Sequence, residues 1–269
     1  MNLERRHELT PLPEILSFKE KTVLVTGSGS AGIGRAIANR FDEGGANLIL
    51  LDINLDGLKE TVLGLKRSDF HSFYRVDLSS KNEIDNFWSD IKTLPDILIN
   101  NAGVYPEQDF CTLSKESFDK TFRINFESAL WMSQNFIKLR GKNGGTIVNV
   151  SSIEAILPFK KDMIPYSVSK EGIIPLTRGL ASEYGDHFKI NAVLPGAIDT
   201  SGTRSMAIKA LKNLRFDLIT TGITFSQRLP KGRWGKADEV AKAVLFLSSD
   251  LSSYVQGAVI PVDGGFLSN

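Results

Sequence analysis

The sequence Thr22-Val-Leu-Val-Thr-Gly-Ser-Gly-Ser-Ala-Gly-Ile-Gly34 joins a short apolar, β-branched run to a turn rich in glycine. The run predicts a buried strand over residues 22–26, and the pattern Arg35-Ala-Ile-Ala-Asn-Arg-Phe41 after the turn predicts a helix. Glycines in such a turn let the backbone approach a pyrophosphate, while the start of the helix supplies free N–H groups and a favourable dipole. We therefore expect the phosphates of a dinucleotide to bind at Gly27, Gly29, Gly32, Ile33 and Gly34.

A second apolar run, Leu48-Ile-Leu-Leu51, ends at Asp52, twenty residues after Gly32. A carboxylate at this distance accepts hydrogen bonds from the adenosine ribose and repels the 2′-phosphate of NADP. Ile53 and Asn54 provide no compensating cation, whereas Arg35 could swing across to a phosphate. The sequence therefore favours NAD as the cofactor, with NADP as the alternative.

Further apolar runs alternate with helical stretches along the rest of the chain. Each ends in a polar or glycine-containing turn, and together they cover residues 96–99, 146–150, 189–194 and 258–262. Strands that alternate with helices predict parallel crossover units. We expect a single α/β domain, a Rossmann fold with a doubly wound parallel sheet and helices on both faces. The carboxyl ends of its strands should carry the functional groups.

Tyr166 and Lys170 lie four residues apart in Tyr166-Ser-Val-Ser-Lys170, a spacing that places both on one face of a helix. An unperturbed tyrosine has a pKa near 10, so only about 0.1% of it is ionised at neutral pH. A positive charge about 4 Å away supplies roughly 4 kcal/mol at an effective dielectric near 20, enough to lower that pKa by about three units. The pair can therefore provide a phenol that exchanges protons, although a core tyrosine beside a solvated lysine would show the same spacing.

Together these motifs resemble those of the short-chain dehydrogenase/reductase family, from about Phe18 to Phe266. The order and spacing of the other motifs agree with this: Thr26-Gly27 with Gly32-Ile-Gly34, Asp77, Asn100-Asn-Ala-Gly103, Asn125, Ser152, Pro195-Gly196 with Thr200, and Val262-Asp-Gly-Gly265. The resemblance implies a seven-stranded parallel sheet and a homotetramer.

The resemblance also implies a catalytic group of Asn125, Ser152, Tyr166 and Lys170. Tyr166 would exchange a proton with the substrate oxygen and Ser152 would hydrogen-bond that oxygen. Lys170 would lower the phenol pKa and bind the nicotinamide ribose, and Asn125 would hold a water in a proton relay. The resemblance implies that the glycine turn, Asp52, Tyr166 and Lys170 contact the cofactor. It also implies contacts from Asp77 and Leu78 to the adenine, and from Asn101, Ala102 and Gly103 to the adenosine. Near the nicotinamide it implies Pro195, Gly196, Ile198 and Thr200.

Two features depart from the family pattern. Four residues instead of three separate Thr26-Gly27 from Gly32-Ile-Gly34, so the amides that meet the phosphates are not assigned by the pattern. Ser152 and Tyr166 are fourteen residues apart, one more than the family spacing, which predicts a bulged loop near residues 159–162. Ser151 is an alternative to Ser152, and Glu154 either faces the substrate or points to solvent.

The composition is typical of a soluble globular protein, with 42% hydrophobic and 23% charged residues. A net charge of +1 gives no reason to expect nucleic acid or an anionic membrane as a partner. His7, His71 and His187 show no metal-ligand spacing, so no metal is expected. The single cysteine, Cys111, and the absence of an apolar signal segment in residues 1–17 fit a cytoplasmic enzyme.

We predict an N-terminal arm over residues 1–17 and a dehydrogenase domain over 18–269, with a substrate-covering segment at about 200–233. The sequence favours an NAD-dependent oxidoreductase that acts on a secondary alcohol or its ketone, a small molecule that the sequence does not identify. The alternatives are an NADP-dependent carbonyl reductase and a cofactor-binding sensor or scaffold without catalysis. An enoyl reductase is disfavoured because that relative spaces its tyrosine and lysine more widely.

Overall fold

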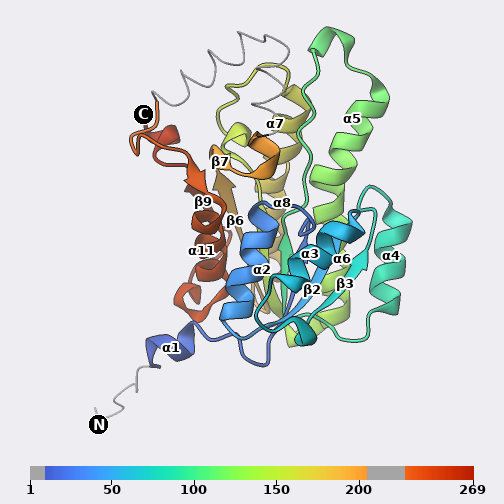
Figure 1. Ribbon diagram of the computed structural model, residues 1–269, viewed down its shortest axis with the longest axis vertical. Coiled ribbons are helices and arrows are strands. Elements are labelled where there is room, and N and C mark those ends of the chain that lie inside the picture. The colour runs from blue at the N-terminus through green and yellow to red at the C-terminus, as the bar shows by residue number, and fades with distance from the viewer. Residues whose placement is uncertain (1–9, 205–227) are drawn as a thin grey trace.

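The computed structural model describes residues 10–204 and 228–269, and its centre is a sheet of seven parallel strands (Figure 1). The strand order is β3-β2-β1-β4-β5-β6-β9. This confirms the predicted doubly wound parallel sheet. The strands are β1 (Thr22–Thr26), β2 (Asn47–Asp52), β3 (Ser72–Arg75), β4 (Ile97–Asn100), β5 (Gly145–Val150), β6 (Phe188–Pro195) and β9 (Val259–Val262).

Alternate residues of the inner strands enter two separate cores, one on each face of the sheet. Val23 and Val25 of β1 belong to the first core, whereas Leu24 belongs to the second. Both faces are therefore buried, which explains why the inner strands are continuous apolar runs. Helices α2 (Ile33–Glu43), α3 (Leu55–Leu63) and α11 (Ala237–Ser248) cover the first face. Helices α4 (Lys81–Asp90), α6 (Ser128–Arg140) and α8 (Ile173–Tyr184) cover the second.

Two further helices lie beyond the carboxyl ends of the strands, in the upper part of Figure 1: α5 (Lys115–Phe122) and α7 (Ile164–Glu171). Short polar side chains begin several helices. Asn54 accepts a hydrogen bond from the Gly57 amide at the start of α3, and Ser114 accepts one from Ser117 at the start of α5. Such caps satisfy backbone donors that have no partner within the helix.

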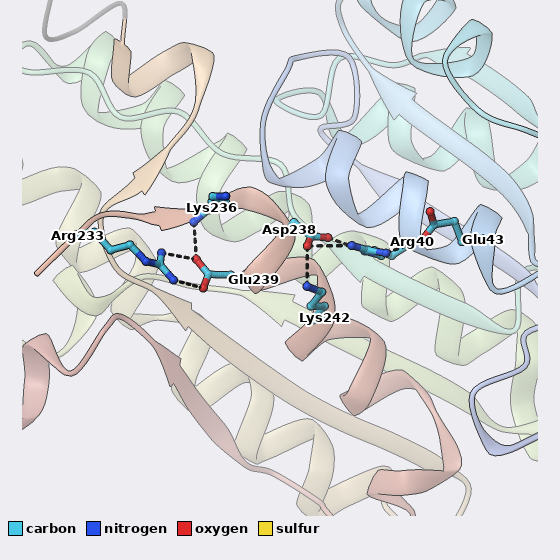
Figure 2. Close-up of polar contacts among 7 residues, drawn as sticks. All are labelled: Arg40, Glu43, Arg233, Lys236, Asp238, Glu239 and Lys242. Carbon is cyan, nitrogen blue, oxygen red and sulfur yellow. Dashed lines mark hydrogen bonds and ion pairs between the residues drawn. The ribbon is translucent and has the colours of Figure 1, made fainter. Parts of the chain in front are cut away.

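An ionic cluster joins α2 to α11, and Figure 2 shows its members. The guanidinium of Arg40 donates two hydrogen bonds to the carboxylate of Asp238, at 2.5 and 2.9 Å, and a third to Glu43 at 2.6 Å. Lys242 pairs with the same Asp238 at 2.8 Å. The two helices, which lie side by side in Figure 1, are therefore held by charged groups at the surface as well as by apolar packing below.

A second small sheet joins the two ends of the predicted substrate-covering segment. In it β7 (Ile198–Asp199) pairs in parallel with β8 (Gly235–Lys236). Arg233 donates to both carboxylate oxygens of Glu239 at 2.8 and 2.6 Å, next to this sheet (Figure 2). Residues 205–227 of the segment and residues 1–9 of the predicted arm lie outside the described part of the chain.

The rest of the predicted arm contains a short helical turn, α1 (Leu12–Ile15), which precedes the first core residue, Phe18. None of the helices among the described residues combines the length and the apolar character that crossing a bilayer requires.

Candidate active site

The turns that follow β1 and β4 are joined at the carboxyl edge of the sheet. The Thr26 hydroxyl accepts hydrogen bonds from the amides of Asn101 and Ala102, at 2.9 and 3.0 Å. The Asn101 side chain donates to the carbonyls of Thr26 and Gly27, at 2.9 and 3.0 Å. Two of the predicted cofactor segments, far apart in sequence, therefore form one continuous polar surface.

The glycine turn bends toward the residues that follow β7. Gly27 has a φ of +69°, a conformation that favours glycine. The Ala31 carbonyl accepts hydrogen bonds from the backbone and the hydroxyl of Ser201, at 3.1 and 3.0 Å. The longer turn is thus held against the start of the substrate-covering segment. Gly32 precedes α2 and has no side chain to cap it, so the first amides of the helix are available to an anion.

Asp52 reaches back from the end of β2 to the glycine turn. Its Oδ2 accepts a hydrogen bond from the Gly29 amide at 2.8 Å, and its Oδ1 accepts one from Asn54 at 2.9 Å. Because a β-carbon on Gly29 would lie 2.8 Å from the Asp52 carboxyl carbon, only glycine allows this approach. The carboxylate therefore lies beside the turn that would hold the phosphates.

The Arg35 side chain is held against α3. Its guanidinium donates to the Thr61 hydroxyl at 2.9 Å and to the Gly57 carbonyl at 3.3 Å, and pairs with Glu60 at 3.3 Å. A swing toward a bound 2′-phosphate would break all three contacts. These contacts are the ones that Arg35 would exchange for a phosphate if NADP were the cofactor.

The expected adenine contacts follow β3 and the expected nicotinamide contacts follow β6, and four strands of the sheet separate the two. Asp77 follows β3, and its carboxylate accepts hydrogen bonds from the Ser79 amide and hydroxyl at 2.9 and 2.7 Å. Leu78 is buried. Pro195 is the last residue of β6, and the amide of Gly196, which follows it, donates to the Val262 carbonyl at 3.0 Å. Ile198 is buried within β7, and Thr200 follows it beside Gly32.

Asn125 lies in a π-helical turn between α5 and α6, over Arg123–Glu127. Its Oδ1 accepts a hydrogen bond from the Val104 amide at 2.7 Å, and its Nδ2 donates to the Val104 carbonyl and the Ser169 hydroxyl at 2.8 and 3.0 Å. Asn125 thus fixes the turn after β4 against α7. Protein groups therefore use both Nδ2 hydrogens and one lone pair of Oδ1. A water held by this side chain would have to donate to the second lone pair of Oδ1.

Tyr166 and Lys170 both lie on α7, as the spacing predicts. The Lys170 ammonium is buried and donates to the Val150 carbonyl at 2.9 Å. A β-carbon on Gly103 would lie 3.2 Å from Lys170 Nζ and 3.5 Å from Asn125 Oδ1. The sheet edge, the turn after β4 and α7 therefore meet at the lysine.

The two adjacent serines have different partners. The Ser151 hydroxyl donates to the Lys170 carbonyl at 2.6 Å. The Ser152 hydroxyl accepts a hydrogen bond from the Glu154 amide at 3.2 Å and lies close enough to the Tyr166 phenol to lower its pKa. Only Ser152 of the two therefore shares its contacts with the tyrosine.

The pKa of Tyr166 is shifted in the direction opposite to the expected one. Burial raises the pKa of Tyr166 to about 12, and the nearby Ser152 hydroxyl only partly offsets this. Burial also lowers the pKa of Lys170 to about 8. The expectation that Lys170 lowers the phenol pKa is not met here, because desolvation acts on both groups and the ammonium is directed to Val150.

Two site residues extend what the motifs predicted. Tyr105, for which the sequence gives no motif, lies edge-on to Tyr166 with ring centroids 6.3 Å apart. Burial raises the pKa of Tyr105, and the nearby Thr200 side chain offsets part of that rise. Glu154 is buried and accepts a hydrogen bond from Ser167 at 3.0 Å, so the interpretation that it points to solvent is wrong.

Histidines and acids form no metal-binding group of three within residues 10–204 and 228–269. His71 is buried beside β3, where its Nδ1 accepts from the Leu48 amide at 3.2 Å and its Nε2 bonds Asp42 at 3.0 Å. His187 lies near Asp186 at the surface, and His7 is outside the described residues.

Comparison with known proteins agrees with this geometry. A family model described as enoyl-(acyl carrier protein) reductase matches residues 28–267. An uncharacterized oxidoreductase of Thermotoga maritima is 34% identical over 93% of this chain and 98% of its own length. The 3-oxoacyl-[acyl-carrier-protein] reductase FabG of the same organism is 34% identical over 94% of this chain and 100% of its own length.

Solved structures of similar proteins cover nearly the whole chain. A proposed 2-deoxy-d-gluconate 3-dehydrogenase from Agrobacterium tumefaciens, with NADP bound, has a TM-score of 0.82 and 28% identity over 94% of this chain and 99% of its own. Levodione reductase has a TM-score of 0.83 and 32% identity over 92% of this chain and 98% of its own.

Proposed function

The chain belongs to the short-chain dehydrogenase/reductase family, and on this premise we propose that it is an NAD-dependent oxidoreductase acting on a secondary alcohol or its ketone. The family membership supports an oxidoreductase with a nicotinamide cofactor. The reacting group and the preference for NAD are inferences from the residues of the site.

The observation that carries the proposal is that Ser152, Tyr166 and Lys170 lie together at the carboxyl end of β5. The Ser152 hydroxyl lies close enough to the Tyr166 phenol to lower its pKa, so both hydroxyls can contact one substrate oxygen. Lys170 is buried one helical turn away with a pKa of about 8. A lysine and a tyrosine four residues apart on one helix also distinguish this site from that of the enoyl reductases, whose tyrosine and lysine are spaced more widely.

In the oxidative direction Tyr166 would accept the hydroxyl proton of the substrate while the carbinol hydrogen leaves as hydride. A bound nicotinamide supplies the hydride acceptor, and its oxidised ring carries a positive charge that favours an ionised phenol. Ser152 would hold the substrate oxygen, and Lys170 would stabilise the developing phenolate. Asn125 would hold the turn after β4 in place and would also hold the water of a proton relay.

The proposed preference for NAD rests on Asp52 and Arg35. Asp52 is held beside the glycine turn by two backbone amides, where its charge repels a 2′-phosphate. Arg35, the nearest cation that the sequence offered, is bound to α3. The NADP in a similar structure makes the NADP-dependent carbonyl reductase the second candidate.

Formation of reduced nicotinamide by the purified protein tests the proposal. NAD and NADP would be offered separately with a panel of sugars, polyols, hydroxysteroids and small secondary alcohols. Ser152→Ala should lower turnover by about 100-fold, whereas the matched variant Ser151→Ala should keep it within a few-fold. If the protein bound cofactor but turned over no substrate of the panel, the proposed enzymatic activity would be contradicted and a sensor would be favoured. Faster turnover with NADP would favour the second candidate.

We further propose that the protein is a homotetramer of the cytoplasm. The family resemblance and the single exposed cysteine support this. Native mass spectrometry should give four times the chain mass of 29.6 kDa, and a monomer would contradict the tetramer.

A further inference from the structure

Glu154 is a buried carboxyl group that the proposed reaction leaves without a role. The residue is only 5% exposed. Oε2 accepts hydrogen bonds from the Ser167 hydroxyl at 3.0 Å and the Phe159 amide at 3.4 Å. Within residues 10–204 and 228–269, Oε1 has no hydrogen-bond partner. A buried polar atom in this state costs about 1–3 kcal/mol, which a polar group of a bound molecule would recover.

The carboxyl group lies beside the reacting atoms. The Ser152 hydroxyl accepts a hydrogen bond from the Glu154 amide at 3.2 Å and lies close enough to the Tyr166 phenol to lower its pKa. Ser167, which holds Oε2, directly follows Tyr166 on α7. Glu154 is also close enough for its charge to raise the pKa of Tyr166. A substrate whose oxygen meets Tyr166 and Ser152 therefore brings its neighbouring atoms toward Glu154.

The properties of this carboxyl group indicate which ligand group would suit it. Burial raises its pKa, whereas the Ser167 hydrogen bond and the Lys160 charge act in the opposite direction. Lys160 itself pairs with Glu107 at 2.5 Å. A protonated carboxyl donates and an ionised one only accepts, and a hydroxyl group can serve either form because it both donates and accepts. A ligand carboxylate could only accept, and an ammonium could only donate.

We propose that Glu154 binds a hydroxyl group on the carbon next to the reacting carbon, so that the substrate is a vicinal diol or its α-hydroxyketone. Glu154 is then a specificity-determining residue, and the substrate class is that of polyols and related sugars. This inference rests on the proposed function, because it takes Tyr166 as the group that contacts the reacting oxygen.

Two matched pairs of alcohols test the inference with NAD: butane-2,3-diol against butan-2-ol, and cyclohexane-1,2-diol against cyclohexanol. The wild type should favour each diol in kcat/KM by about tenfold, the effect of one hydrogen bond of about 1.4 kcal/mol. Glu154→Leu should reduce that ratio to near one, because it removes the group that binds the second hydroxyl. Glu154→Gln should keep part of the preference, because an amide both donates and accepts. The control Glu107→Leu, which removes a nearby carboxylate outside the reacting group, should keep all of it.

The results also separate this inference from the proposed function. A wild type that oxidises the monoalcohols without preferring the diols would overturn the role of Glu154 and leave the proposed function standing. An unchanged diol preference in Glu154→Leu would also overturn the role of Glu154. If that variant lost activity equally on the diol and the monoalcohol of each pair, Glu154 would have a structural role instead. No turnover of any alcohol by the wild type would overturn both.

Discussion

The ionic cluster between α2 and α11 stabilises charged groups by pairing them, whereas the site around Tyr166 disfavours charge by burying its titratable groups. At the helix interface, Arg40 and Asp238 are about one-third exposed and directly paired (Figure 2). The Arg40 hydrogen bond is the main cause that lowers the pKa of Asp238 to about 2, and the Arg233 hydrogen bond does the same for Glu239. At the active site, burial dominates instead, and it lowers the pKa of Lys170 to about 8 and raises that of Tyr166 to about 12.

The difference separates charges that stabilise the fold from groups that can react. A carboxylate with a pKa of about 2 stays ionised throughout the physiological range and takes no part in proton transfer. A buried lysine with a pKa of about 8 is already about one-tenth deprotonated at pH 7 and is half deprotonated at pH 8, so a change in its surroundings readily alters its charge. Removing a charge at the active site should therefore lower activity without lowering stability, whereas removing one at the helix interface should lower stability without changing activity.

Tyr166→Phe should give the largest effect. Removing the phenol oxygen takes away the proposed proton acceptor and should lower turnover by about 1,000-fold or more, since general acid–base groups contribute about 10²–10⁴. Steady-state kinetics and NAD titration by calorimetry would measure this, with cofactor affinity expected to change only a few-fold. Retained turnover would exclude the assigned role of Tyr166.

Lys170→Met should lower turnover by about 100-fold, weaken cofactor binding and stabilise the fold. The pKa of Lys170 is lowered from 10.5 to about 8 on folding, so its burial is unfavourable at every pH below about 8. This difference corresponds to about 3 kcal/mol at neutral pH, from which about 1 kcal/mol is subtracted for the lost Val150 hydrogen bond. Urea unfolding at pH 7 should show a gain of about 2 kcal/mol.

The gain in the Lys170→Met variant should shrink as the pH rises from about 8 toward 10.5, where the folded wild type releases its proton before the unfolded chain does. A variant that is less stable than the wild type at pH 7 would show that the buried ammonium stabilises the site.

Asp52→Ala should change the cofactor preference without stopping the reaction. Loss of the carboxylate removes the repulsion of the 2′-phosphate and a ribose acceptor, so the ratio of kcat/KM for NAD over NADP should fall by about tenfold. Asp56→Ala is a matched control, because Asp56 is a solvent-exposed acid on the neighbouring helix. Equal ratios in the wild type and both variants would show that Asp52 does not contact the ribose.

Asp238→Asn should give the smallest effect, and on stability alone. The pair with Arg40 is partly exposed, so we expect a loss of about 1 kcal/mol at pH 7 and unchanged turnover. Because folding lowers the pKa of Asp238 from 3.8 to about 2, its contribution is complete above about pH 4 and is lost as the pH falls toward 2. Thermal unfolding between pH 2 and 7 would measure it, and a difference that persists at pH 2 would contradict the pairing.

The sequence could predict the parts of the site that depend on local order. The glycine turn after β1, Asp52 at the end of β2, and Tyr166 with Lys170 on one helix follow from strand–helix alternation and side-chain spacing. The structure places all of them at the carboxyl edge of the sheet. Alternating burial in β1 and β2 explains why the strands were recognisable as apolar runs.

The remaining features depend on contacts between distant segments. The sequence contains no signal that brings Tyr105 against Tyr166 and Thr200, or Ser201 against Ala31. Arg35 could not be assigned to α3 without the packing of Thr61 and Gly57. The pKa of Tyr166 depends on burial, which the spacing to Lys170 does not reveal, and for that reason its predicted direction was wrong.

The pH dependence of alcohol oxidation by the wild type, with NAD saturating at each pH, tests the central claim most directly. If the proton leaves through Tyr166, log kcat should rise with pH by about one unit per pH unit below the controlling pKa and then level off. Asp238→Asn should give the same curve between pH 6 and 10. A flat profile over that range would contradict proton transfer to an ionising tyrosine at the buried site.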